Sequence, residues 1–99
     1  MGAFEQDFKQ AIEKLQEERK AQGKRPYNVH YYRLSRTSRV FGKVLIQGGS
    51  SGFSVEVYLN ARGYEVITLQ DNTKRTFKKN ELDDVVNYIK DLLEAPLTN

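Results

Sequence analysis

The sequence predicts a small α+β domain with an N-terminal helix, an antiparallel meander of four strands (a fifth is an option) and a C-terminal helix. Two stretches with a helical hydrophobic period lie towards the ends of the chain, and the stretch between them is rich in β-branched and aromatic residues. Short connections favour antiparallel pairing of consecutive strands, and two helices with one apolar stripe each are expected on one face of the sheet. The chain has 99 residues, the size of one domain, so residues 1–99 are interpreted as a single unit.

The N-terminal helix is predicted over residues 4–22. Phe8, Ile12 and Leu15 recur at spacings of four and three, which places them on one helical face. Acidic residues dominate the start of this segment and basic residues its end, the order that the helix dipole favours. Gly23 is expected to end the helix.

The strands are predicted from runs of β-branched and aromatic residues between turn-like sequences. The loops at 48–52 and 60–63 are the clearest separators, because glycine and asparagine favour tight turns. The predicted strands cover residues 28–34, 39–47, 53–59 and 64–70, with 74–77 as the optional fifth.

The C-terminal helix is predicted over residues 81–94. Leu82, Val85, Ile89 and Leu93 follow the helical period, and Asn80 is a suitable N-cap.

Alternation along each strand divides its side chains between two faces. In the third strand Phe53, Val55, Val57 and Leu59 form an apolar set, which is expected to face the helices. In the first strand the pattern is ambiguous, and Tyr32 and Leu34 are assigned to the helix side. The opposite, open face is then predicted to carry Tyr31, Arg33, Phe41, Lys43, Tyr58 and Tyr64.

Charge is distributed unevenly along the chain. Residues 19–43 carry eight basic residues and no acidic residue, whereas the segments before and after are net acidic. Such asymmetry is typical of proteins with an anionic partner, although a well-solvated basic surface would give the same count.

The preferred interpretation is a small non-enzymatic domain that binds nucleic acid, with single-stranded DNA or RNA favoured. Aromatic rings interleaved with basic side chains on a sheet can stack bases and hold phosphates. The alternative is a protein-interaction module, such as a phage- or plasmid-type inhibitor or adaptor, that uses the same patch on an acidic protein. The predicted site residues are Tyr31, Arg33, Arg36, Arg39, Phe41, Lys43, Tyr58 and Tyr64.

A secondary basic cluster lies between the fourth strand and the last helix. Lys74, Arg75, Lys78 and Lys79 could hold phosphate near a helix N-terminus, or form a solvated turn whose charges balance nearby acids. The solvated turn is the preferred interpretation.

Catalytic and cofactor sites are not expected. The chain has no cysteine and one histidine, His30, so neither a zinc site nor a cysteine–histidine nucleophile pair can be built. The glycine-rich loop at 48–52 lacks the ending of a phosphate-binding P-loop. The absence of cysteine favours a reducing, cytoplasmic compartment, and no membrane span is expected.

Self-association is a further expectation. An open sheet face that carries several aromatic side chains is an apolar patch, and monomers rarely leave such patches uncovered. A homodimer through that face or through an edge strand would cover it.

Overall fold

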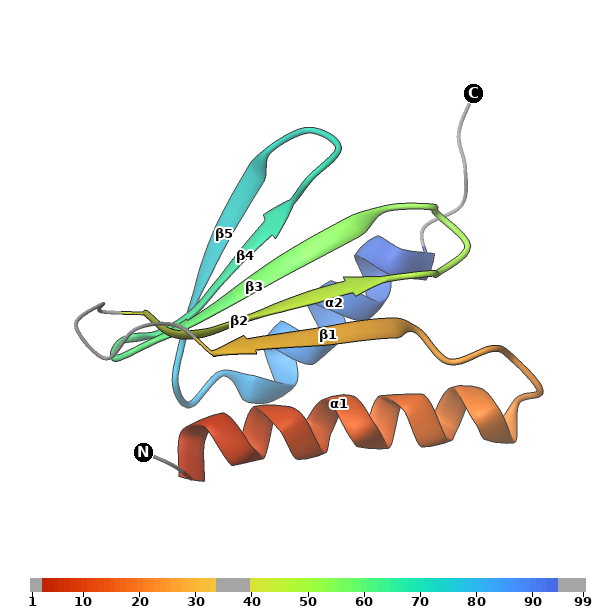
Figure 1. Cartoon of the computed structure of the whole chain (residues 1–99), viewed down its shortest axis with the longest axis horizontal. Helices are drawn as coiled ribbons and strands as arrows, with labels where there is room; N and C mark the ends of the chain where they lie inside the picture. The colour runs from red at the N-terminus through yellow and green to blue at the C-terminus, as the bar shows by residue number, and fades with distance from the viewer. Residues whose placement is uncertain (1–2, 34–39, 95–99) are drawn as a thin grey trace.

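The computed structural model describes the backbone of residues 3–33 and 40–94, and the side chains of residues 6–32 and 42–94. The elements follow the predicted order, the fifth strand is present, and each element begins within one residue of its predicted start (Figure 1). They are α1 (Ala3–Ala21), β1 (Asn28–Arg33), β2 (Val40–Gln47), β3 (Ser54–Asn60), β4 (Gly63–Thr68), β5 (Thr73–Lys78) and α2 (Leu82–Glu94).

The five strands form one antiparallel sheet in the order β1-β2-β3-β4-β5, so every strand pairs with its neighbours in sequence. The β3–β4 hairpin is tight, because Asn60 pairs with Gly63. The side-chain oxygen of Asn60 accepts hydrogen bonds from the backbone N–H groups of Arg62 at 2.9 Å and Gly63 at 3.2 Å. Gly63 has a φ of +148°, and a Cβ there would lie 2.0 Å from the carbonyl oxygen of Phe77, so this turn requires glycine.

Two ring contacts place both helices on the same face of the sheet. Phe8 of α1 packs on Tyr64, and Tyr88 of α2 packs on Phe77, each with ring centroids 5.4 Å apart. Tyr64 and Phe77 are directly paired across β4 and β5, so their side chains share one face. In Figure 1, α1 runs alongside β1 while α2 crosses the sheet.

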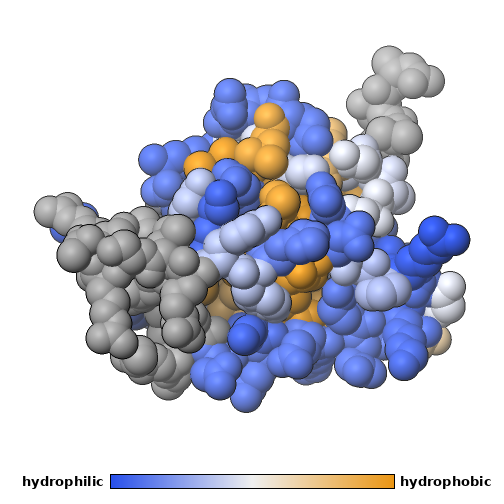
Figure 2. Space-filling model, in the orientation of Figure 1, coloured by the Kyte–Doolittle hydropathy of each residue, from blue (hydrophilic) through white to orange (hydrophobic). Residues whose placement is uncertain are grey.

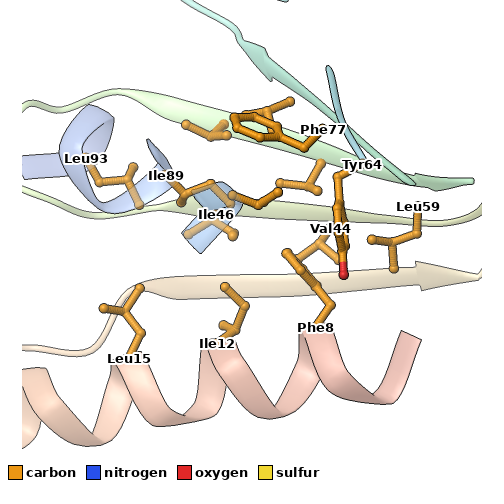
Figure 3. Packing of buried hydrophobic residues seen from close by; sticks show 14 of the residues in the cluster. Phe8, Ile12, Leu15, Val44, Ile46, Leu59, Tyr64, Phe77, Ile89 and Leu93 are labelled. Carbon is orange, nitrogen blue, oxygen red and sulfur yellow. The ribbon is translucent and has the colours of Figure 1, made fainter. Parts of the chain in front are cut away.

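The core lies between this face and the two helices. Figure 3 shows Phe8, Ile12 and Leu15 pointing from α1 towards the sheet. Val55, Val57 and Leu59 of β3 are buried in the same cluster, which confirms their predicted inward orientation, whereas Phe53 precedes β3 and is half-buried. The core residues are Phe8, Ile12, Leu15, Tyr27, Val44, Ile46, Val55, Val57, Leu59, Tyr64, Val66, Phe77, Val85, Ile89 and Leu93.

A polar cluster joins the C-terminal ends of the two helices. The guanidinium of Arg19, which is 9% exposed, donates to Glu94 at 2.5 Å, and the Tyr27 hydroxyl donates to the same carboxylate oxygen. The Ser50 hydroxyl donates to the other oxygen at 3.2 Å. Three separate parts of the chain thus converge on Glu94, a residue far from all of them in sequence.

Candidate nucleic-acid interface

A row of three side chains crosses the open face of the sheet, the face that carries no helix. Tyr32 of β1 pairs with Lys43 of β2, and Lys43 pairs with Tyr58 of β3, so the three side chains lie side by side. We call them the tyrosine–lysine row. Tyr32 is 45% exposed, and the ammonium group of Lys43 lies 5.2 Å from the centroid of its ring. Two aromatic rings therefore flank one cation on a surface open to solvent.

The charge of Lys43 is shared with a carboxylate on the neighbouring strand. Its ammonium nitrogen lies 3.3 Å from Glu56, and the Tyr58 hydroxyl donates to the other oxygen of the same carboxylate at 3.2 Å. The hydrogen bond and the negative charge of Glu56 raise the pKa of Lys43, so this lysine stays protonated. Burial, followed by the charge of Glu56, raises the pKa of the Tyr58 hydroxyl, which stays neutral and keeps its ring available for stacking.

A second lysine of the open face also lies beside a carboxylate. Lys74 of β5 lies 3.4 Å from Glu65 of β4. Leu45 and Ile67, which flank Glu56 on the two adjacent strands, are half-buried. Figure 2 shows a largely hydrophilic surface interrupted by small hydrophobic areas. Lys43 and Lys74 on the open face thus each lie beside a carboxylate.

The predicted faces of β1 are wrong. Tyr31 pairs with the buried Val44 and therefore lies on the helix side, where the ammonium group of Lys9 in α1 is 5.0 Å from its ring centroid. Tyr32, which was assigned to the helix side, lies on the open face. The sequence could not decide between them because β1 is an edge strand: Tyr31 is 43% exposed and Tyr32 45%.

The prediction that Tyr64 lies on the open face is also wrong. Tyr64 is 2% exposed and packs against Phe8 in the core. It pairs directly with Leu59, whose inward orientation was predicted correctly. Recognition of the two-residue hairpin between Asn60 and Gly63 would have placed both side chains on one face.

Two predicted site residues, Arg36 and Arg39, lie outside the described residues. For Arg33 and Phe41 the structure describes the backbone and not the side chain. The backbone of Arg33 pairs with Gly42 at the end of β1, next to the tyrosine–lysine row. The segment that connects β1 to β2 therefore begins and ends beside this row.

The secondary basic residues do not gather at one place. Lys74 lies on the open face beside Glu65, whereas Arg75 lies on the helix side over the rings of Phe77 and Tyr88. Alternation along β5 separates them, because neighbouring strand residues point to opposite faces.

The described residues contain no candidate metal site, because no group of three or more histidine or acidic side chains is placed to hold a metal ion. Nor does either helix combine the length and the hydropathy needed to cross a membrane. No protein-family model matches the chain, and comparison with curated proteins and with solved structures finds no significant similarity.

Proposed function

We propose that this domain binds single-stranded nucleic acid through the tyrosine–lysine row and the adjoining basic segment from Arg33 to Lys43. The observation that carries the proposal is the pairing of Tyr32, Lys43 and Tyr58 across three adjacent strands on a face without a helix. Tyrosine rings on an open sheet stack bases regardless of sequence, and cations between them hold phosphates.

The spacing of the row suits adjacent or next-nearest bases of an extended strand. Tyr32 and Tyr58 are two strands apart, which corresponds to roughly 9–10 Å at the usual separation of paired strands. Lys43 lies between them and would contact the phosphate that joins the stacked nucleotides. The segment between Arg33 and Lys43 adds Arg36 and Arg39 and contains no acidic residue.

Glu56 opposes this binding because it already neutralises Lys43. A phosphate must compete with the carboxylate or share the ammonium group with it. Glu56→Gln would remove the competing charge and keep a side chain of the same size. We therefore expect Glu56→Gln to tighten nucleic-acid binding and to steepen its salt dependence by up to about one unit of slope.

The proposal is tested by fluorescence anisotropy with a labelled oligothymidine at several salt concentrations. Tyr32→Ala and Tyr58→Ala should each weaken binding about five-fold to 150-fold, equivalent to roughly 1–3 kcal/mol per stacked base, with little change in salt slope. Tyr31→Ala is the matched control: Tyr31 is almost equally exposed but lies on the other face of the same strand. A Tyr31 variant that loses as much affinity as the Tyr32 variant would contradict the proposed surface.

The basic segment is tested separately. Replacing Arg33, Arg36, Arg39 and Lys43 together with alanine should abolish binding. The thermal stability should change little, because a surface ion pair such as that of Lys43 with Glu56 contributes little to folding. No oligonucleotide binding by the unmodified domain at low salt would refute nucleic-acid binding altogether.

A second candidate function is binding of an acidic protein through the same patch. The observation in its favour is the balanced charge at the centre of the open face, where Leu45 and Ile67 are half-buried beside Glu56. Mixed apolar and paired polar groups of this kind suit protein contacts as well as nucleic-acid contacts. A second copy of the chain would cover the same face, and sedimentation at micromolar concentration distinguishes this homodimer from a monomer.

A further inference from the structure

A groove of about 420 Å³ lies between the edge strand β5 and the outer side of α2, away from the tyrosine–lysine row. In the described part of the sheet, β5 pairs only with β4. On its other edge, the backbone N–H and C=O groups of Lys78 are already bonded to Glu81, at 2.7 Å and 3.0 Å, so Lys74 and Thr76 offer the backbone groups for a further strand. The groove is lined on the β5 side by Arg75 and Phe77, and the α2 side contributes Asp84, Tyr88 and Asp91. The open part of the β5 edge therefore borders a groove that is lined by aromatic and charged side chains.

The aromatic wall of this groove already holds one guanidinium group. Arg75 lies over the rings of Phe77 and Tyr88, at 5.0 Å and 4.9 Å from their centroids. Its guanidinium forms no ion pair with a carboxylate among the described residues. Arg75 therefore contacts the groove through cation–π attraction, and this aromatic wall suits cationic side chains.

Two carboxylates of the groove, those of Asp84 and Asp91, remain available to a second cation, whereas Glu81 accepts a hydrogen bond from the backbone N–H of Lys78. Glu81, Asp84 and Asp91 give three negative charges against the one positive charge of Arg75. Asp84 and Asp91 form no ion pair with any described residue, and both are exposed. Asp84, Tyr88 and Asp91 are spaced by four and three residues along α2, which places these three side chains on one stripe of the helix. The groove thus has a net charge of −2 beside the part of the β5 edge that Lys74 and Thr76 leave open.

The opposite side of the same edge has the opposite charge. Lys74, Thr76 and Lys78 alternate with Arg75 and Phe77 along β5, so they lie on the open face. A strand added to β5 would place every second side chain over the acidic groove and the others beside these lysines. Cross-strand neighbours of opposite charge stabilise such pairing, and like charges oppose it.

We propose that β5 and this groove bind an extended segment of a partner protein, which adds to the sheet as a sixth strand. The segment carries arginine or lysine at alternate positions, facing Asp84, Tyr88 and Asp91. The positions between them carry acidic or hydroxyl side chains, facing Lys74 and Lys78. This binding surface is separate from the tyrosine–lysine row, so it does not depend on nucleic-acid binding.

The test uses an end-blocked peptide as long as β5, which has 6 residues, with arginine alternating with glutamate and threonine. Its control has the same composition, but its arginines are consecutive, so both peptides have the same net charge. We expect the alternating peptide to bind the full chain more tightly and to shift the amide NMR signals of β5 and α2. Proline at a central position of the peptide should abolish binding if its backbone pairs with β5.

Matched variants of α2 identify the groove. Asp84→Asn and Asp91→Asn together should weaken the alternating peptide about five-fold or more, as for two partly screened charge contacts. Asp83→Asn is the control, because Asp83 is equally exposed but lines a different hollow, between α1 and α2. All three acids are exposed, so these variants are expected to fold.

Three results would overturn the proposal. One is equal affinity for the alternating and the rearranged peptide, and another is an equal loss from Asp83→Asn and from the double variant. The third is a set of β5 signals that move with protein concentration in the absence of peptide, which would mean that a second copy of this chain occupies the edge.

Discussion

Tyr64→Ala is expected to remove much of the stability of this domain, whereas Tyr58→Ala is expected to remove little. The two tyrosines lie on adjacent strands, but Tyr64 is 2% exposed and Tyr58 is half-buried on the opposite face. A buried aromatic side chain withdraws about 150–250 Å² from water, equivalent to about 4–6 kcal/mol at about 25 cal/mol per Å². Measured replacements of buried aromatics by alanine cost about 3–5 kcal/mol. For Tyr58→Ala we expect a loss of about 1 kcal/mol.

The assay is urea unfolding of both variants and the unmodified chain, followed by circular dichroism. A loss of about 3–5 kcal/mol is large against the roughly 5–15 kcal/mol that small domains possess, so Tyr64→Ala could fail to fold. Tyr64→Leu keeps part of the buried volume and should lose less, which preserves the comparison. Equal losses for the Tyr64 and Tyr58 variants would refute the assignment of Tyr64 to the core and of Tyr58 to the open face.

A spectroscopic measurement checks the same assignment without mutation. Burial, followed by the charge of Asp7, raises the pKa of Tyr64 to about 12. Its hydroxyl should therefore remain protonated between pH 10 and 11, where a tyrosine with the ordinary pKa of 10.0 ionises. In an absorbance titration, the phenolate signal of the unmodified chain should exceed that of Tyr64→Phe only above pH 11, and this difference is the signal of Tyr64.

Three further substitutions test the packing around this core. Thr68→Val should stabilise the domain by about 1 kcal/mol in urea unfolding, because the buried Thr68 hydroxyl has no hydrogen-bond partner among the described residues and valine has the same shape. Gly49→Ala should destabilise the domain and lower its melting temperature, because the new Cβ would lie 2.1 Å from the carbonyl oxygen of Leu93. Glu94→Gln should cost about 1–3 kcal/mol at neutral pH, because it leaves the buried Arg19 without its carboxylate. Partial burial raises the pKa of Glu94, but the Tyr27 hydrogen bond and the charge of Arg19 outweigh it, so the net pKa lies below the ordinary 4.5. The stability from Glu94 is thus present above pH 4.5 and lost as the pH falls through the folded pKa, and Glu94→Gln should remove this acid-dependent loss.

The fold could be predicted from sequence wherever one pattern was unambiguous. The third strand alternates cleanly between Val55, Val57 and Leu59 and polar residues, so its buried face was predicted correctly. The last helix has one apolar stripe, and its first residue, Leu82, lies next to the predicted start. Such elements have a single arrangement that removes their apolar area from water.

The orientation of the tyrosines could not be predicted in the same way. Tyrosine has an apolar ring and a polar hydroxyl, so it satisfies either face of a half-open sheet. Tyr64 was misplaced because its strand offered two apolar sets, and only the pairing of Asn60 with Gly63 decides between them. In β1 the residues Tyr31 and Tyr32 are nearly equal in exposure, so burial itself distinguishes them little.

The charge count along the sequence overstated the basic surface because folding brings distant acids to it. Within the described part of 19–43, two basic residues are ion-paired: Arg19 with Glu94, which is 75 positions away, and Lys43 with Glu56. Of the other six, Lys20, Lys24 and Arg25 precede β1 and Arg33 is its last residue, while Arg36 and Arg39 lie outside the described residues. β1 is 6 residues long and so spans roughly 17–20 Å, which exceeds the Debye length of about 8 Å at physiological ionic strength, so charges at its two ends do not act as one patch. Arg33, Arg36 and Arg39 adjoin the tyrosine–lysine row in sequence. These three arginines and Lys43, rather than the whole basic segment, must supply the phosphate contacts that the proposed function requires.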